Sequence, residues 1–187
     1  MKILLVTAHP RTDSLTHAAA NAFAEAARSN GHEIETADLM AEGFDPIVRE
    51  PDEPDWANSA KLYSPTVQNE MARIERNEAT VMIFPVYWWS MPALLKGWID
   101  RVWNNGWAYG EGKYPHKRAW MLAIGGAAAD GYTKRGYDAA MRTQLNVGIL
   151  GYCGIAEPRL ELLYGSIDDA SGPETILATA RQLGSEF

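Results

Sequence analysis

The sequence predicts an α/β fold in which helices cover both faces of a doubly wound parallel sheet. Short apolar runs alternate along the chain with longer segments whose apolar residues recur at helical spacing. The runs are unbroken rather than alternating, as in Ile3-Leu4-Leu5-Val6, which is typical of strands that are buried on both faces. Right-handed crossovers between such strands leave few topologies.

Five strands are expected, and the first of them should lie at the centre of the sheet. The connection after the second strand, residues 38–65, is rich in Pro and Asp and is expected to be mostly irregular. The strands are expected at residues 2–7, 33–37, 80–84, 118–124 and within 155–164.

Helices are expected between these strands. Asp13 or Ser14 can cap the first helix, and Gly31 closes it. The helix after the third strand has Pro92 in its first turn, where the missing N–H of proline would have no intrahelical partner. The other helices are expected at residues 66–77, 141–150 and 173–183, with residues 125–133 as a loop.

Length and composition indicate one domain over residues 1–187, with 47% hydrophobic residues and a formal net charge of −7. No run of Lys or Arg is present, which argues against nucleic acid as a partner. The short apolar start resembles neither a signal peptide nor a membrane span, so we expect a cytoplasmic protein without membrane insertion. A single cysteine excludes an intrachain disulfide, and the histidines lack metal-ligand spacing, so no metal site is expected.

Three loops after strands carry the unusual residues. The first loop contains hydroxyl groups and the cations Arg11 and, if protonated, His9, next to the N–H groups of a helix start. This combination suits a phosphate or pyrophosphate. An ordinary helix cap with solvated charges is the alternative.

The second loop, residues 85–89, places three aromatic side chains after Pro85. A flavin ring needs a flat apolar wall and nearby backbone hydrogen-bonding groups, which such a loop provides. A dimer interface or a core cluster is the alternative. In the third loop, Gly125 and Gly126 would let the backbone approach a planar ligand and offer N–H groups to it, although paired glycines can also mark a simple turn.

Several segments together resemble one known family, the NAD(P)H dehydrogenase (quinone) or DT-diaphorase family of flavodoxin-like flavoproteins. The segments are TAHPRTDSLT at residues 7–16, FPVYWWSMPALLKGWIDRVW at 84–103, NNGWAYG at 104–110, the glycine pair at 125–126 and GILGYCGIAEPRL at 148–160. The resemblance implies the flavodoxin-like strand order 2-1-3-4-5. It also implies a ligand crevice beyond the carboxyl ends of strands one, three and four.

The resemblance further implies the roles of individual residues. Trp107 and Tyr109 match an aromatic loop that roofs the partner's site in a homodimer. Tyr132 matches a Tyr that helps to neutralise charge on the reduced flavin, while the family's His falls on Tyr137 or Asp138, which leaves Tyr132 and Tyr137 as catalytic candidates. The flavin-binding positions are His9, Ser14, Leu15, Thr16, Pro85, Val86, Tyr87, Trp88, Trp89, Gly125 and Gly126.

The implied activity is transfer of hydride from NADH or NADPH, through a flavin, to a quinone or another planar acceptor by a ping-pong mechanism. The resemblance favours FAD, with FMN as the alternative. Two other functions remain open at this point: a flavodoxin-type one-electron carrier, and a regulatory accessory subunit of a membrane transporter.

Overall fold

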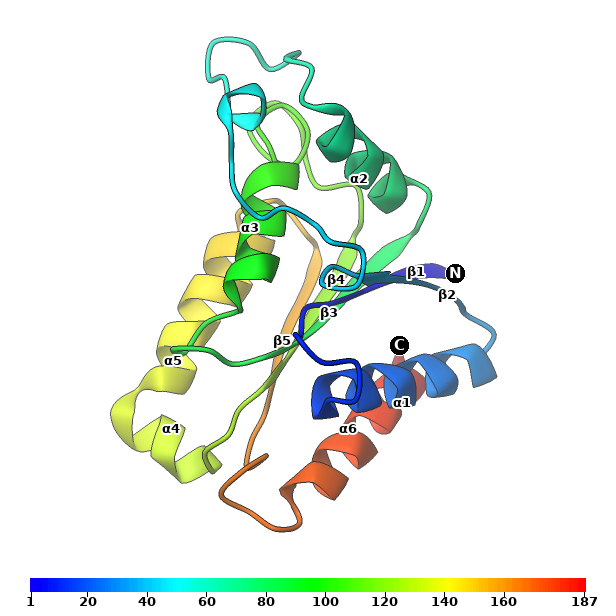
Figure 1. The fold of residues 1–187 in the computed structure, drawn as a ribbon, viewed down its shortest axis with the longest axis vertical. Helices are drawn as coiled ribbons and strands as arrows, with labels where there is room; N and C mark the ends of the chain where they lie inside the picture. The colour runs from blue at the N-terminus through cyan, green and yellow to red at the C-terminus, as the bar shows by residue number, and fades with distance from the viewer.

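A computed structural model describes residues 1–187 and contains one sheet of five parallel strands (Figure 1). The strand order is β2-β1-β3-β4-β5, so the predicted topology is confirmed. The strands are β1 (Lys2–Thr7), β2 (Glu33–Asp38), β3 (Ala79–Pro85), β4 (Arg118–Ile124) and β5 (Glu157–Leu163).

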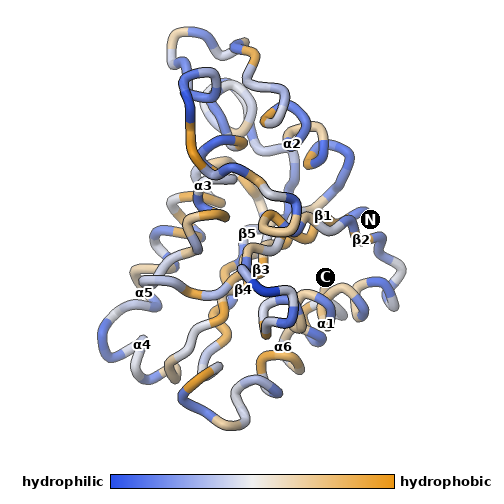
Figure 2. Tube along the Cα trace, viewed as in Figure 1, coloured by the Kyte–Doolittle hydropathy of each residue, from blue (hydrophilic) through white to orange (hydrophobic).

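Helices cover both faces of the sheet, which explains the unbroken apolar run in β1. Leu4 and Val6 pack on one face, while Ile3 and Leu5 pack on the other. Figure 2 shows the hydrophobic stretches along these central strands. One face carries α1 (Leu15–Ser29) and α6 (Gly172–Glu186). The other carries α2 (Pro65–Glu75), α3 (Ala93–Val102), α5 (Tyr137–Met141) and the π-helix η2 (Arg142–Gly151).

The first helix begins and ends as its sequence indicates. Ser14 is the N-cap and accepts a hydrogen bond from the backbone N–H of His17. The helix stops at Asn30, and Gly31 follows with φ of 82°, a conformation that glycine adopts without steric cost. Gly184 lets α6 approach α1 closely, because a Cβ there would lie 2.3 Å from the carbonyl oxygen of Phe23.

Three local predictions need correction. Residues 125–133 are not all loop, since α4 (Ala129–Arg135) begins there; it is too short for a periodic pattern and buries only Tyr132. Gly136, with φ of 71°, separates it from α5, so the next helical segment starts before the predicted residue 141 and continues as the π-helix. Pro92 is the N-cap of α3 and does not lie in its first turn.

The long connection between β2 and α2 is mostly irregular, as predicted, apart from the short 3-10 turn η1 (Glu50–Asp52). A buried ion pair anchors it to α3: Arg101 donates to the Asp52 carboxylate at 2.6 Å. Burial alone would raise the pKa of Asp52, but hydrogen bonds from Ser64 and Arg101 outweigh it and hold this pKa below its ordinary value. None of the helices has the length and apolar content that crossing a bilayer requires.

Candidate functional site

The loops that follow β1, β3, β4 and β5 meet at the carboxyl edge of the sheet, where they line one hollow of about 280 Å³. It brings together most of the residues predicted for a cofactor. From the first loop come His9, Ser14, Leu15 and Thr16, from the second Pro85, Val86 and Tyr87, and from the third Gly126. The arrangement agrees with the rule that ligands bind beyond the carboxyl ends of strands at a topological switch point.

A second hollow, of about 410 Å³, adjoins the first, because Val86 and Gly126 line both. It is mostly apolar and reaches α4 and α5. It contains the predicted residues Trp89, Tyr132 and Tyr137. Trp88 and Trp89, together with Val86 and Tyr87, line a shallower surface.

The aromatic loop is a tight two-residue turn between Tyr87 and Ser90, whose backbone groups exchange hydrogen bonds of 3.0 and 3.1 Å. The two residues inside the turn are Trp88 and Trp89, and both have positive φ, 50° and 61°. Asn and Gly normally occupy such positions, because a bulky side chain there is strained by about 1–3 kcal/mol. Trp88 is also 92% exposed. Neither the strain nor the exposure of this tryptophan stabilises the fold, and such features are typical of functional sites.

The two glycines differ in whether their backbone N–H group is available to a ligand. Gly125 donates its N–H to the carbonyl oxygen of Leu163 at 2.7 Å, so this N–H is not free. A Cβ on Gly125 would lie 2.6 Å from the hydroxyl oxygen of Tyr132, and the glycine therefore makes room for that side chain. Gly126 donates its N–H to no other group of the chain and lines both hollows.

The two candidate tyrosines differ in environment. Tyr132 is 6% exposed, and burial raises its pKa, so its hydroxyl stays a neutral hydrogen-bond donor at physiological pH. Tyr137 is half-buried and packs edge-on against Trp89, with ring centroids 4.2 Å apart. The rings of Tyr132 and Tyr137 are perpendicular, with centroids at 6.3 Å.

Sequence reasoning missed residues at both hollows. Arg135, at the end of α4, is the only charged residue that lines the second hollow; it donates to the carbonyl oxygen of Gly131 at 3.1 Å and pairs with no carboxylate. Ser166 and Ile167 line the first hollow from the loop after β5. The parallel strand order could have placed Ser166 and Ile167 at this edge of the sheet. For Arg135, the only indication in the sequence is that it follows Tyr132 closely along the chain.

The first loop forms a hydrogen-bonded chain with β2. Ser14 Oγ lies 2.9 Å from Nδ1 of His17, and His17 Nε2 lies 2.9 Å from a carboxylate oxygen of Asp38. His9 accepts a hydrogen bond from the backbone N–H of Arg11 at its Nδ1, at 3.1 Å. The loop is therefore tied to α1 and to the end of β2, with Ser14 at the hollow.

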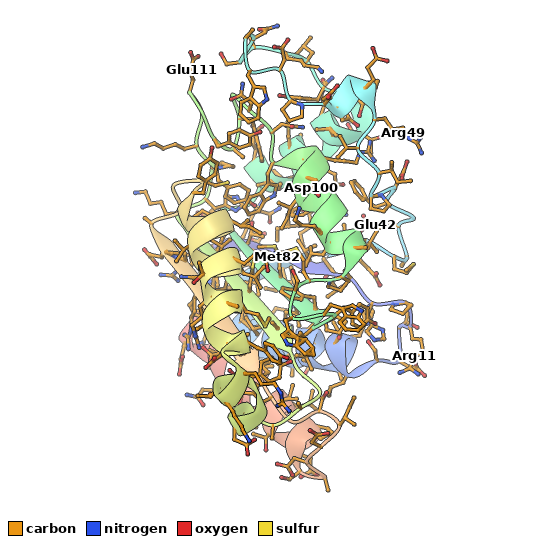
Figure 3. All side chains as sticks on the ribbon, turned by 90° about the vertical axis from the view of Figure 1, so that its left-hand side faces the viewer. Arg11, Glu42, Arg49, Met82, Asp100 and Glu111 are labelled. Carbon is orange, nitrogen blue, oxygen red and sulfur yellow. The ribbon has the colours of Figure 1, made fainter.

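Trp107 and Tyr109 line neither hollow. Trp107 donates its indole N–H to Glu75 at 2.7 Å, and the Tyr109 ring packs near those of Trp56 and Tyr152. Figure 3 shows Glu111, from the same loop, near one end of the molecule and well away from Arg11. Within one chain these two aromatic residues therefore do not reach the site.

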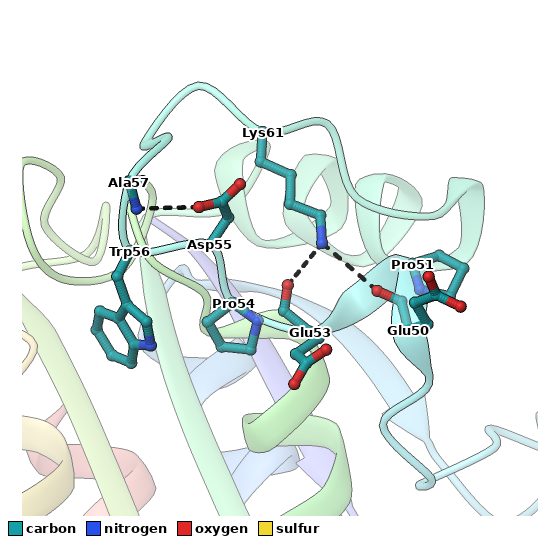
Figure 4. A pocket seen from close by; sticks show the side chains of 8 residues that line it. All are labelled: Glu50, Pro51, Glu53, Pro54, Asp55, Trp56, Ala57 and Lys61. Carbon is teal, nitrogen blue, oxygen red and sulfur yellow. Dashed lines mark hydrogen bonds between the residues drawn. The ribbon is translucent and has the colours of Figure 1, made fainter.

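The largest hollow, of about 820 Å³, lies elsewhere, in the irregular segment of residues 50–61 (Figure 4). It is open, three of its eight lining residues are acidic, and its one cation, Lys61, donates to the backbone carbonyl oxygen of Glu53 at 2.7 Å. Trp56 and two prolines line it, but none of the residues predicted for the cofactor does. No group of side chains in the structure could hold a metal ion, and burial raises the pKa of Cys153 to about 11, which makes its thiol a poor nucleophile.

Comparison with known proteins identifies a family with this fold and several similar oxidoreductases. Residues 1–185 match the family described by a flavodoxin-like fold. An uncharacterized NAD(P)H oxidoreductase of Escherichia coli, YcaK, is 36% identical over 89% of this chain and 85% of its own length. NAD(P)H dehydrogenase [quinone] 1 of Cavia porcellus is 29% identical over 88% of this chain and 68% of its own. The solved NAD(P)H:quinone oxidoreductase of Methanothermobacter marburgensis superposes with a TM-score of 0.90 and 29% identity, covering 100% of this chain and 95% of that one.

Proposed function

Because the chain belongs to the family of proteins with a flavodoxin-like fold, we propose that it is a flavin-dependent NAD(P)H oxidoreductase that reduces quinones or similar planar acceptors. The observation that carries this proposal is the pair of adjoining hollows at the carboxyl edge of the sheet. One is polar at the helix start and the other is apolar and flanked by aromatic rings, which matches the two ends of a flavin nucleotide.

The residues present fit such a cofactor. The N-terminal end of α1, with Ser14, Leu15 and Thr16 at the hollow, would hold the phosphate of the tail, together with His9. The aromatic turn, from Pro85 to Trp89, and the free N–H of Gly126 would hold the ring system. We propose FAD, the cofactor that the family resemblance favours, and FMN is the alternative outcome of the test below.

The bound flavin would supply the hydride chemistry, and this chain would supply orientation and electrostatics. Tyr132 stays a neutral donor, so it can stabilise negative charge beside Gly126 without carrying charge itself. Trp89 and Tyr137 would stack on planar rings and exclude water. A nicotinamide and an acceptor would use the same hollow in turn, which requires a ping-pong mechanism.

We also propose that residues 1–187 act as one flavin-binding domain in a homodimer, with Trp107 and Tyr109 over the partner's site. Neither residue lines a hollow of its own chain, so a role at a site would be one played in a second copy. Light scattering after gel filtration tests it, and a monomer that retains full turnover contradicts it.

The function is tested by adding FAD or FMN to the purified protein, identifying the retained flavin by mass, and measuring initial rates with NADH or NADPH and a quinone. The expected result is a retained flavin and parallel lines in double-reciprocal plots, the signature of ping-pong kinetics. If a flavin is retained but neither nicotinamide reduces it, a one-electron carrier replaces the proposed enzyme. If no flavin is retained, the proposal fails.

A further inference from the structure

The hydrogen-bonded chain from Ser14 through His17 to Asp38 has a property that a simple helix cap lacks. Both contacts of the imidazole are 2.9 Å long, and the side chains of His17 and Asp38 are only 15% and 19% exposed. Ser14 is buried and lines the hollow where the proposed function places the cofactor phosphate. One serine is therefore shared between an imidazole and a ligand site.

The hydrogen-bond partners of Asp38 assign the tautomer of His17. One carboxylate oxygen of Asp38 accepts the backbone N–H groups of Met40 and Ala41, both at 3.2 Å, and the other faces Nε2 of His17. A carboxylate only accepts hydrogen bonds, so Nε2 carries a hydrogen. In the neutral imidazole, Nδ1 is then an acceptor, and the only group facing it is the Ser14 hydroxyl.

This assignment removes Ser14 as a donor while the imidazole is neutral. The single hydroxyl hydrogen of Ser14 points to Nδ1 of His17, and its oxygen accepts the backbone N–H of the same residue at 3.2 Å. When the imidazole is protonated, Nδ1 becomes the donor, and the Ser14 hydroxyl hydrogen is released toward the hollow. A phosphate oxygen is an acceptor only, so it binds well to the second arrangement and poorly to the first.

We propose that His17 is a positioning residue that takes up a proton when the phosphate-bearing tail of the flavin binds at Ser14. The inference rests on the proposed function, because it needs a phosphate at the first loop. The negative charge of the phosphate favours the protonated imidazole, and the freed hydroxyl adds a charge-assisted hydrogen bond. Flavin affinity thereby becomes linked to pH through the tail, independently of the ring.

The other charged groups of this region are few and define the controls. Asp38 approaches the imidazole from the end of β2, and the His9 ring approaches it edge-on from the first loop, with centroids 6.3 Å apart. Arg11 lines the hollow and pairs with Asp13 at its solvent side, at 3.6 Å. His9 is the only other histidine in this region.

The experiment compares FMN with riboflavin, which has the same ring but no phosphate. Dissociation constants are measured with the apoprotein from about pH 6.5 to about pH 8.5. This range lies above the second pKa of a phosphate monoester, about 6, so the phosphate stays mostly in its doubly charged form. Proton uptake is measured at about pH 7.5 by calorimetry in two buffers of different ionisation enthalpy. The variants are His17→Gln, His9→Gln and, as a matched control far from the site, His32→Gln.

For the wild type we expect FMN affinity to fall about tenfold across this range, as the loss of one charge-assisted hydrogen bond would produce. Riboflavin affinity should stay flat, and FMN binding should take up a fraction of a proton. His17→Gln should abolish both the pH dependence and the uptake, while His32→Gln should keep them. Thermal melts check that each variant is folded.

Two results would overturn the inference while leaving the proposed function intact. One is FMN binding whose pH dependence matches that of riboflavin. The other is a pH dependence of FMN affinity that persists in His17→Gln, whether or not it persists in His9→Gln. If neither flavin binds the wild type at any pH, the proposed function fails as well, so the two failures are distinguishable.

Discussion

Replacing Trp88 with Asn should make the apoprotein more stable and its flavin complex weaker. The backbone of Trp88 is left-handed, with φ of 50°, in a turn that Asn adopts readily. A left-handed residue with a bulky side chain costs about 1–2 kcal/mol, and Asn relieves much of this. The two effects have opposite signs, which makes the prediction selective. A mutation that merely damages the fold would lower both the stability of the apoprotein and its affinity for flavin.

The structure sets the size of the stability gain. The Trp88 side chain is 92% exposed, so its removal forfeits little buried area. Its stacked neighbour is Trp89, at a centroid distance of 6.2 Å, and losing that pair costs about 0.5 kcal/mol. The remainder is a gain of about 0.5–1 kcal/mol, which corresponds to an increase in Tm of about 1–4 °C for a chain of this size.

The assay is thermal and urea unfolding of the apoprotein, paired with flavin titration. Flavin affinity should fall about tenfold, because an aromatic surface of the proposed ring site is lost. Trp56→Asn is the matched control for stability: this tryptophan is 73% exposed and its φ is not positive, so the same substitution should not stabilise the apoprotein. A destabilised Trp88→Asn apoprotein would show that the turn is not strained at Trp88, and an unchanged flavin affinity would show that Trp88 lies outside the ring site.

Three further predictions follow from other contacts. Asp52→Ala leaves Arg101 buried without its partner and should lower the free energy of unfolding by about 3–5 kcal/mol in urea titrations. The hydrogen bond from Arg76 lowers the pKa of Glu35 from 4.5 to about 2, so Glu35 stabilises the fold above pH 4.5 and this contribution is lost as pH falls toward 2. After allowance for solvent screening, Glu35→Gln should lower the free energy of unfolding by about 1 kcal/mol at neutral pH. Urea titrations should show the difference in stability between variant and wild type shrinking as the pH falls from 4.5 toward 2. Arg135→Gln should lower kcat/KM about tenfold for a sulfonated quinone and leave a neutral quinone nearly unchanged; equal effects on both would contradict a charge role.

The fold could be predicted because its determinants are local and repeated. The run Ile3-Leu4-Leu5-Val6 contributes residues to both faces of the sheet, which an unbroken apolar pattern requires. The short helix α4 escaped prediction, because a segment that buries one residue has no period to detect. The π-helical continuation after α5 depends on backbone hydrogen bonds that no composition encodes.

The candidate site was predictable as a set of loops but not as a set of contacts. The parallel strand order brings His9, Pro85 and Gly126 to one edge, as expected. Tryptophan rarely adopts a positive φ, so the sequence could reveal the aromatic loop but not the backbone strain of its two tryptophans. The bond between His17 and Asp38 joins residues that are 21 positions apart, and neither belongs to a motif.

We propose above that the carboxyl edge of this sheet holds a flavin that accepts hydride from a nicotinamide. An anaerobic titration of the flavin-loaded protein with NADH or NADPH, followed by flavin absorbance and then by addition of a quinone, tests it most directly. We expect complete bleaching at one equivalent of nicotinamide and full recovery with one equivalent of quinone. A bound flavin whose absorbance neither nicotinamide changes would contradict it.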